Sequence, residues 1–208
     1  MKIKNPIKGL YAVTPEVADN NRLLLLAEQV LSGGARTLQY RDKSSDGARR
    51  LTQARLLLQL CRRHDACFII NDDPQLALAV EAHGVHIGRD DARLQQAREL
   101  LGRDAIIGVS CYDDLAMAQQ LIAAGADYIA FGAIFPSVSK PDADSASLAS
   151  VSAASALGLP VVAIGGITLD NASSVIEAGA DAIAVINALF SAADPRQAAR
   201  CFSDLFLP

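Results

Sequence analysis

The sequence has no tryptophan, only 5% aromatic residues, and no apolar run long enough to span a bilayer. It also lacks an excess of positive charge, because 19 Lys and Arg residues stand against 23 Asp and Glu residues. A formal net charge of -4 gives no basic field that would attract nucleic acid or an anionic membrane. Any anionic ligand must therefore be held by local groups.

The four cysteines form no C-x-x-C pair and have no histidines at the spacing of zinc ligands. They are Cys61, Cys67, Cys111 and Cys201. We interpret them as reduced residues of a core or helix face, which predicts a cytoplasmic protein. The N-terminal residues 1–6 carry charge but no apolar segment follows them, so no targeting segment is predicted.

Apolar residues make up 51% of the chain and recur in short runs that alternate with helical patterns. Strands are predicted at 9–14, 37–43, 66–71, 85–87, 105–110, 128–132, 161–164 and 182–186. The tetrapeptide Ala-Gly-Ala-Asp occurs at 124–127 and at 178–181, each time between a helix and a strand. The repeated unit predicts a single (β/α)8 TIM barrel over residues 1–208, with an open doubly wound sheet as the alternative.

Carboxylates follow two neighbouring predicted strands, at Asn71-Asp72-Asp73 and at Asp90-Asp91. Oxygen ligands without interleaved Cys or His suit Mg2+, which keeps waters and takes further ligands from a substrate phosphate. Aspartate also caps helices well, so capping is the simpler explanation for either acid alone. The metal hypothesis therefore depends on the residues around these acids.

A cationic face is predicted on the second strand, where Gln39, Arg41 and Lys43 point the same way because side chains repeat every second residue. On an isolated strand, a polar face of this kind is explained as the face exposed to solvent. At the carboxyl end of a barrel strand it points into the active site instead.

Three later segments carry groups that suit phosphoryl ligands. The loop after the sixth strand holds Ser137, Ser139 and Lys140, while Gly165-Gly166 and Ile186-Asn187 end the seventh and eighth strands. Glycine lets the backbone approach a ligand closely, and loops after these last two strands often hold phosphate in barrels. Each segment alone is explained as a surface loop or turn. Together with Arg41, Lys43, Asp72 and Asp91, on the same predicted rim, they predict a site for two phosphorylated ligands and a metal.

The chain resembles the thiamine phosphate synthase family in segments that follow in order over essentially its whole length. The matching segments are 9–15 (GLYAVTP), 39–43 (QYRDK), 70–73 (INDD), 84–88 (GVHIG), 108–110 (GVS), 126–132 (ADYIAFG), 136–140 (PSVSK) and 163–167 (AIGGI). The resemblance implies a transferase that joins hydroxymethylpyrimidine diphosphate to a thiazole phosphate, with or without a carboxylate on the thiazole. Pyrophosphate leaves and thiamine phosphate forms.

Loss of diphosphate from an electron-rich aminopyrimidine leaves a delocalised cation, so such a reaction needs charge neutralisation and a partner held close. The resemblance assigns Mg2+ to Asp72 and Asp91. It assigns the pyrimidine diphosphate to Gln39, Tyr40, Arg41, Asp42, Lys43, Asn71, Ser110 and Lys140. Arg41, Lys43 and Lys140 are the implied catalytic cations. The thiazole phosphate is assigned to Ser137, Val138, Ser139, Gly166, Ile186 and Asn187.

Two residues depart from the family pattern, because Ser137 stands where Thr is common and Asn187 where Ser is usual. We interpret His86, inside a short apolar strand, as an oriented core histidine rather than as a base. Small-molecule substrates are the expected partners, and the choice between a monomer and a homo-oligomer stays open.

Three alternatives remain at this point. A thiazole tautomerase-like paralogue would lack the Asn-Asp-Asp segment and would have a histidine where this chain has Ala133. A non-catalytic phosphate-binding relative would have lost a metal aspartate or Lys140, and none is lost. A sugar-phosphate epimerase would need an acid/base pair, which the cationic face on the second strand does not supply.

Overall fold

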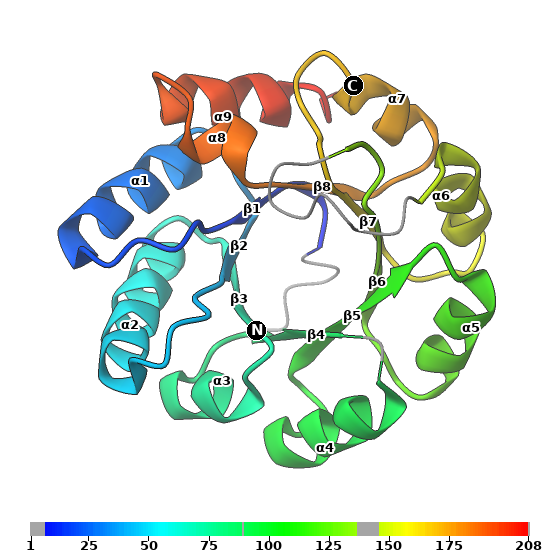
Figure 1. Ribbon diagram of the computed structural model, residues 1–208, viewed down its shortest axis with the longest axis horizontal. Helices are drawn as coiled ribbons and strands as arrows, with labels where there is room; N and C mark the ends of the chain where they lie inside the picture. Colours follow the sequence, from blue (N-terminus) through cyan, green and yellow to red (C-terminus); the bar gives the residue numbers. More distant parts are fainter. Residues whose placement is uncertain (1–6, 89, 137–145, 208) are drawn as a thin grey trace.

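The computed structural model describes residues 7–88, 90–136 and 146–207. Eight parallel strands close into a barrel in sequence order, with β8 paired to β1. Figure 1 looks down this barrel and shows the helices as a ring around it. The closure confirms the predicted (β/α)8 barrel and excludes the open sheet, in which β1 and β8 would not pair.

The strands are β1 Gly9–Val13, β2 Thr37–Tyr40, β3 Cys67–Asn71, β4 Gly84–Ile87, β5 Ile106–Tyr112, β6 Tyr128–Phe131, β7 Val161–Ile164 and β8 Ala182–Val185. The helices are α1 Asn20–Ser32, α2 Gly47–Arg63, α3 Pro74–Val80, α4 Asp91–Leu101, α5 Leu115–Ala123, α6 Leu148–Ser155, α7 Ala172–Glu177, α8 Asn187–Phe190 and α9 Pro195–Asp204. Among the helices of the described ranges, none is long and apolar enough to cross a membrane.

Side chains alternate between two cores along each strand. Outward residues such as Leu38 and Ile70 pack in a large cluster with the helices. Inward residues such as Ile69, Tyr128 and Ala184 fill the barrel itself. The interior is therefore packed rather than hollow, and a ligand has to bind above it, at the ends of the strands.

Aspartate carboxylates cap most of the helices by accepting a hydrogen bond from a backbone N–H of the first turn. The capping residues are Asp19, Asp46, Asp73, Asp90, Asp114 and Asp194, before α1, α2, α3, α4, α5 and α9. Within the two acidic segments, capping thus falls to Asp73 and Asp90. Asp72 is left without a capping role, and Asp91 is the first residue of α4.

Strand β2 ends at Tyr40, three residues before the predicted end at Lys43. The backbone leaves the sheet because the Arg41 N–H donates to Thr14 Oγ1 at 3.0 Å instead of to a strand. The Ser44 N–H then donates to Asp42 Oδ1 at 2.7 Å, which makes a turn. The contact with Thr14 joins distant parts of the chain, so the local alternation does not reveal where the strand ends.

Candidate active site

A cavity of about 550 Å3 opens at the carboxyl ends of the strands, with residues from every strand end in its wall. The predicted site residues that line it are Gln39, Arg41, Lys43, Asn71, Asp72, Ser110, Gly166, Ile186 and Asn187. These residues come from the ends of five strands, β2, β3, β5, β7 and β8, and meet only because the barrel closes. The cavity is large enough for a small organic ligand.

Several predicted residues lie beyond the part of the chain that can be described. Ser137, Val138, Ser139 and Lys140 are outside the described residues, and so is the side chain of Asp91. Their roles in binding the thiazole phosphate, the diphosphate and the metal stay predictions.

Tyr40 and Asp42 point away from the cavity, toward α2. Tyr40 packs in the outer cluster and its hydroxyl donates to Gln53 Oε1 at 2.8 Å. The Asp42 side chain is 1% exposed and its Oδ2 accepts from Arg49 Nη2 at 3.0 Å. Tyr40 follows Gln39 on β2 and therefore points to the other side, and Asp42, past the end of the strand, is held there by Arg49. Neither residue lines the cavity to which the resemblance assigns the pyrimidine diphosphate.

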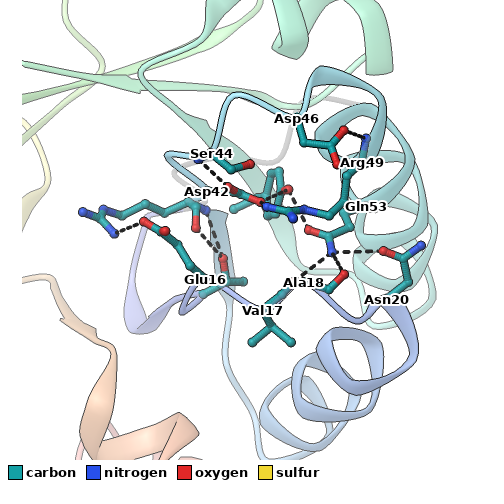
Figure 2. A network of polar contacts seen from close by, with 12 residues as sticks. Glu16, Val17, Ala18, Asn20, Asp42, Ser44, Asp46, Arg49 and Gln53 are labelled. Carbon is teal, nitrogen blue, oxygen red and sulfur yellow. Dashed lines mark hydrogen bonds and ion pairs between the residues drawn. The ribbon is translucent and has the colours of Figure 1, made fainter.

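A polar network behind β2 joins these outward residues to the loop after β1 (Figure 2). The Gln53 Nε2 group donates to the carbonyl of Val17 at 2.9 Å and to Asn20 Oδ1 at 3.0 Å. Burial would raise the pKa of Asp42, but hydrogen bonds from Ser44 and Arg49 outweigh it and hold that pKa below its usual value. We call Tyr40, Asp42, Arg49 and Gln53 the brace, because Arg41 lies between two of its members.

Cations gather on the rim of the cavity. Arg41 Nη1 lies 3.4 Å from Glu16 Oε1, with 26% of the Arg41 side chain exposed. Lys43 and Arg93 are exposed and line the same cavity. The sequence analysis missed Arg93, although its place in the first turn of α4, two residues after Asp91, could have indicated it. These guanidinium and ammonium groups suit phosphoryl oxygens.

Asp72 is the described carboxylate at the metal site that the sequence predicts. Its backbone is left-handed, with φ of 59°, and its Oδ2 accepts from Asn71 Nδ2 at 2.8 Å. No group of three or more His, Cys, Asp and Glu side chains suited to a metal lies within the described ranges. Mg2+ needs fewer protein ligands, since it is bound by one or two carboxylates with waters and substrate phosphate. An exposed Asp72 carboxylate on a cavity rim fits that donor set.

The opposite side of the rim presents backbone rather than charged side chains. Gly165 and Gly166 have φ of 104° and 61°, a region that favours glycine. A Cβ on Gly166 would lie 2.4 Å from the Pro136 carbonyl oxygen, so a side chain has no room there. Asn187 begins the short helix α8 directly after Ile186. N–H groups at such positions are suited to phosphate.

The floor of the cavity contains three ring side chains that the sequence analysis did not assign to the site, Tyr11, His86 and Tyr128. The aromatic residues of an apolar strand resemble core residues, and these two tyrosines are indeed buried. His86 is oriented as predicted, because its ring nitrogens lie 3.0 Å from the Tyr128 hydroxyl and from Ser110 Oγ. It is nevertheless part of the cavity wall.

Comparison with known proteins gives relatives that match almost the whole chain. The family model described as thiamine monophosphate synthase matches residues 10–189. The thiamine-phosphate synthase of Methylobacillus flagellatus is 57% identical over 201 residues, which cover 97% of this chain and 96% of that protein. That of Chromobacterium violaceum is 56% identical over 200 residues, covering 96% and 97%.

Among solved structures, the thiamine phosphate pyrophosphorylase from Pyrococcus furiosus superimposes with a TM-score of 0.85 at 35% identity. The match covers 97% of this chain and 96% of that one. Fold, cavity and sequence therefore agree, and the chain belongs to the thiamine monophosphate synthase family.

Proposed function

We propose that this chain joins 4-amino-2-methyl-5-hydroxymethylpyrimidine diphosphate to a thiazole phosphate, releasing pyrophosphate and forming thiamine phosphate. The observation that carries the proposal is one cavity with a cationic side and a glycine-lined side, in a chain of this family. Ala133 lines the cavity where a tautomerase would have a histidine, which favours the synthase. The four free thiols support a cytoplasmic location.

The cations on the rim would bind the diphosphate and carry its growing charge as it leaves. Arg41 and Lys43 lie next to the strand end that holds Gln39, so diphosphate on these cations would leave the pyrimidine over the polar floor. Stabilising charge that develops in the transition state is the effective form of catalysis for such a leaving group. Lys140 is proposed as a third cation, and Arg93 as a further one.

The thiazole phosphate would lie across the cavity, with its phosphate on the N–H groups at Gly166 and Asn187. This arrangement would direct the thiazole nitrogen toward the methylene carbon of the pyrimidine. Holding two partners in this way converts a bimolecular step into an effectively unimolecular one. Ser137, Val138 and Ser139 are proposed to complete this side.

Magnesium is proposed as the cofactor, held by the carboxylates of Asp72 and Asp91. When bound there, it would neutralise diphosphate oxygens and add charge stabilisation that the cationic side chains alone supply only in part. Asn71 would orient Asp72 through the hydrogen bond between them. An Asp72→Asn variant keeps the size of the side chain and removes its charge, so it should need far more Mg2+ for half-maximal turnover.

The deciding experiment incubates the purified protein with both substrates, with and without Mg2+, and measures thiamine phosphate and pyrophosphate together. We expect equal amounts of both products, formed only when both substrates and the metal are present. Pyrophosphate without thiamine phosphate would indicate a hydrolase. Binding of both substrates without products would favour a phosphate-binding relative.

A further inference from the structure

A continuous chain of hydrogen bonds crosses the interior of the barrel beneath the cavity. Gln39 Nε2 donates to the Tyr11 hydroxyl at 2.8 Å, and the Tyr11 and Tyr128 hydroxyls lie 2.8 Å apart. Tyr128 then contacts His86 Nδ1 at 3.0 Å, and His86 Nε2 contacts Ser110 Oγ at 3.0 Å. The two ends of this chain, Gln39 and Ser110, both line the cavity.

Once the Gln39 amide donates to Tyr11, only one direction of donation along this hydrogen-bond chain gives every buried hydroxyl proton an acceptor. Tyr11 is 1% and Tyr128 0% exposed, so a hydroxyl proton without an acceptor would be costly there. Because Gln39 donates to the Tyr11 hydroxyl and cannot accept its proton there, Tyr11 must donate that proton to the Tyr128 hydroxyl. Tyr128 in turn must donate to His86 Nδ1.

This direction fixes the tautomer of His86. A ring nitrogen that accepts a hydrogen bond carries no proton, so the neutral ring has its proton on Nε2. Nε2 then donates to Ser110 Oγ, and the Ser110 hydroxyl keeps its own proton for a ligand. At the other end, Gln39 has its carbonyl oxygen left to accept a hydrogen bond.

We propose that Tyr11, Tyr128 and His86 act as positioning residues that make Gln39 an acceptor and Ser110 a donor in the pocket, and so select a 4-aminopyrimidine over its 4-oxo analogue. The inference rests on the proposed function for the identity of the substrate. In a 4-aminopyrimidine the exocyclic amine can donate to the Gln39 carbonyl oxygen, and a ring nitrogen can accept from the Ser110 hydroxyl. In the 4-oxo analogue a carbonyl replaces the amine and one ring nitrogen gains a proton, so both contacts meet like groups.

Packing holds the Tyr128 and His86 rings in the positions that the hydrogen bonds require. A Cβ on Gly108 would lie 1.9 Å from Tyr128 Cζ, so only glycine leaves space for the tyrosine ring inside the barrel. The His86 and Tyr128 rings stack with centroids 5.5 Å apart. Burial raises the pKa of Tyr11 and of Tyr128 above the ordinary value, which keeps both hydroxyls protonated.

The direction of the chain can be tested without any substrate. Nitrogen-15 NMR of the full-length protein distinguishes the two histidine tautomers, and the His86→Asn variant assigns the His86 signals among the three histidines. We expect the proton on Nε2. A proton on Nδ1 would reverse every hydrogen bond in the chain and would overturn the proposal.

Selectivity is tested by comparing kcat/KM for the amino and 4-oxo pyrimidine diphosphates. We expect Tyr128→Phe, which keeps the ring and removes the hydroxyl, to reduce the preference for the amino substrate by about ten- to hundredfold. Tyr11→Phe is the second variant, and the KM for the thiazole phosphate should stay unchanged in both. Cys67→Ala is the control, because Cys67 belongs to the same interior cluster and contributes no hydrogen bond to the chain.

An equal loss of activity toward both pyrimidines would overturn the proposal, since a merely structural role of the hydroxyls predicts that result. Absence of turnover with either pyrimidine in the wild-type protein would refute the proposed function instead. In that case the tautomer of His86 still confirms or refutes the direction of the chain.

Discussion

The two sides of the cavity present different chemical groups. From β1 to β5 the wall carries charged and polar side chains, including Arg41, Lys43 and Asp72, and we call this side the cationic half. From β6 to β8 it carries mainly small apolar residues and glycines, including Gly165 and Gly166, and we call this side the backbone half. A single barrel thus presents charged side chains on one side of the cavity and backbone N–H groups on the other.

The difference corresponds to the role that we propose for each side. A departing diphosphate gains charge during the reaction, and cationic side chains can follow it. A phosphate that does not react needs only a rigid cradle, which backbone N–H groups at glycine and at a helix start supply. The comparison predicts that damage to the cationic half lowers kcat, whereas damage to the backbone half raises one KM.

The largest effect is expected for Lys43→Ala in the cationic half. Removing a cation that stabilises the leaving group should lower kcat by about a hundredfold or more, with little change in the KM for the thiazole phosphate. Steady-state kinetics with each substrate varied in turn measures both quantities. Lys8→Ala is the control, since Lys8 lines a different cavity, beside Gly9 at the start of β1. Equal losses in the two variants would refute a specific role for Lys43.

A smaller effect is expected for Gly166→Ala in the backbone half. The new Cβ would press on the Pro136 carbonyl oxygen at a positive φ, so the KM for the thiazole phosphate should rise about tenfold or more. Gly158→Ala is the matched control, because Gly158 also has positive φ, of 84°, but no atom within 4 Å of its Cβ position. A similar rise in KM in the control would mean that backbone strain alone explains the result.

The brace behind the cationic half should have a moderate effect. We expect Asp42→Asn to lower kcat/KM about tenfold, because Arg41 loses a fixed neighbour. Asp46→Asn, at the start of the same helix, removes the same charge outside the brace and should leave kcat/KM unchanged.

The stability of the brace should depend on pH with a definite sign. The folded-state pKa of Asp42 is lowered, so its stabilisation is present above the unfolded-state pKa of about 3.9 and is lost as the pH falls through the folded-state value. Urea unfolding at several pH values should therefore show a deficit in Asp42→Asn at pH 7 that shrinks below about pH 4. A deficit independent of pH would contradict this explanation.

The smallest effect is expected for Glu16→Gln. Glu16 is half exposed and pairs with Arg41, so it competes with the diphosphate for the same guanidinium. Removing its charge should lower the KM for the pyrimidine diphosphate by about two- to threefold at low ionic strength, and added salt should abolish the difference. A higher KM in the variant would show that Glu16 positions Arg41 for the ligand.

The sequence was informative wherever a local period decides the outcome. Alternation predicted that Gln39, Arg41 and Lys43 face the same way, and all three line the cavity although β2 ends at Tyr40. The repeated strand and helix pattern predicted the closed barrel. The same alternation argues against a pocket role for Tyr40 and Asp42, which the family resemblance alone had assigned to the substrate. For the direction of these side chains, the two-residue alternation was a better guide than the family resemblance.

Long-range contacts decided what the sequence did not reveal. Tyr11 and Tyr128 are 117 residues apart and meet only inside the closed barrel, so each looked like an ordinary core residue. The early end of β2 depends on Thr14, which belongs to another loop. Asp72 and Asp73 are alike in sequence, and only the cap at α3 separates their roles.

A crystal structure of the protein with Mg2+, pyrophosphate and thiamine phosphate would test the division of the cavity most directly. We expect pyrophosphate against Arg41, Lys43 and Asp72, and the phosphate of thiamine phosphate on the N–H groups at Gly166 and Asn187. Pyrophosphate bound at the glycines, with the phosphate of thiamine phosphate on the cations, would contradict this division.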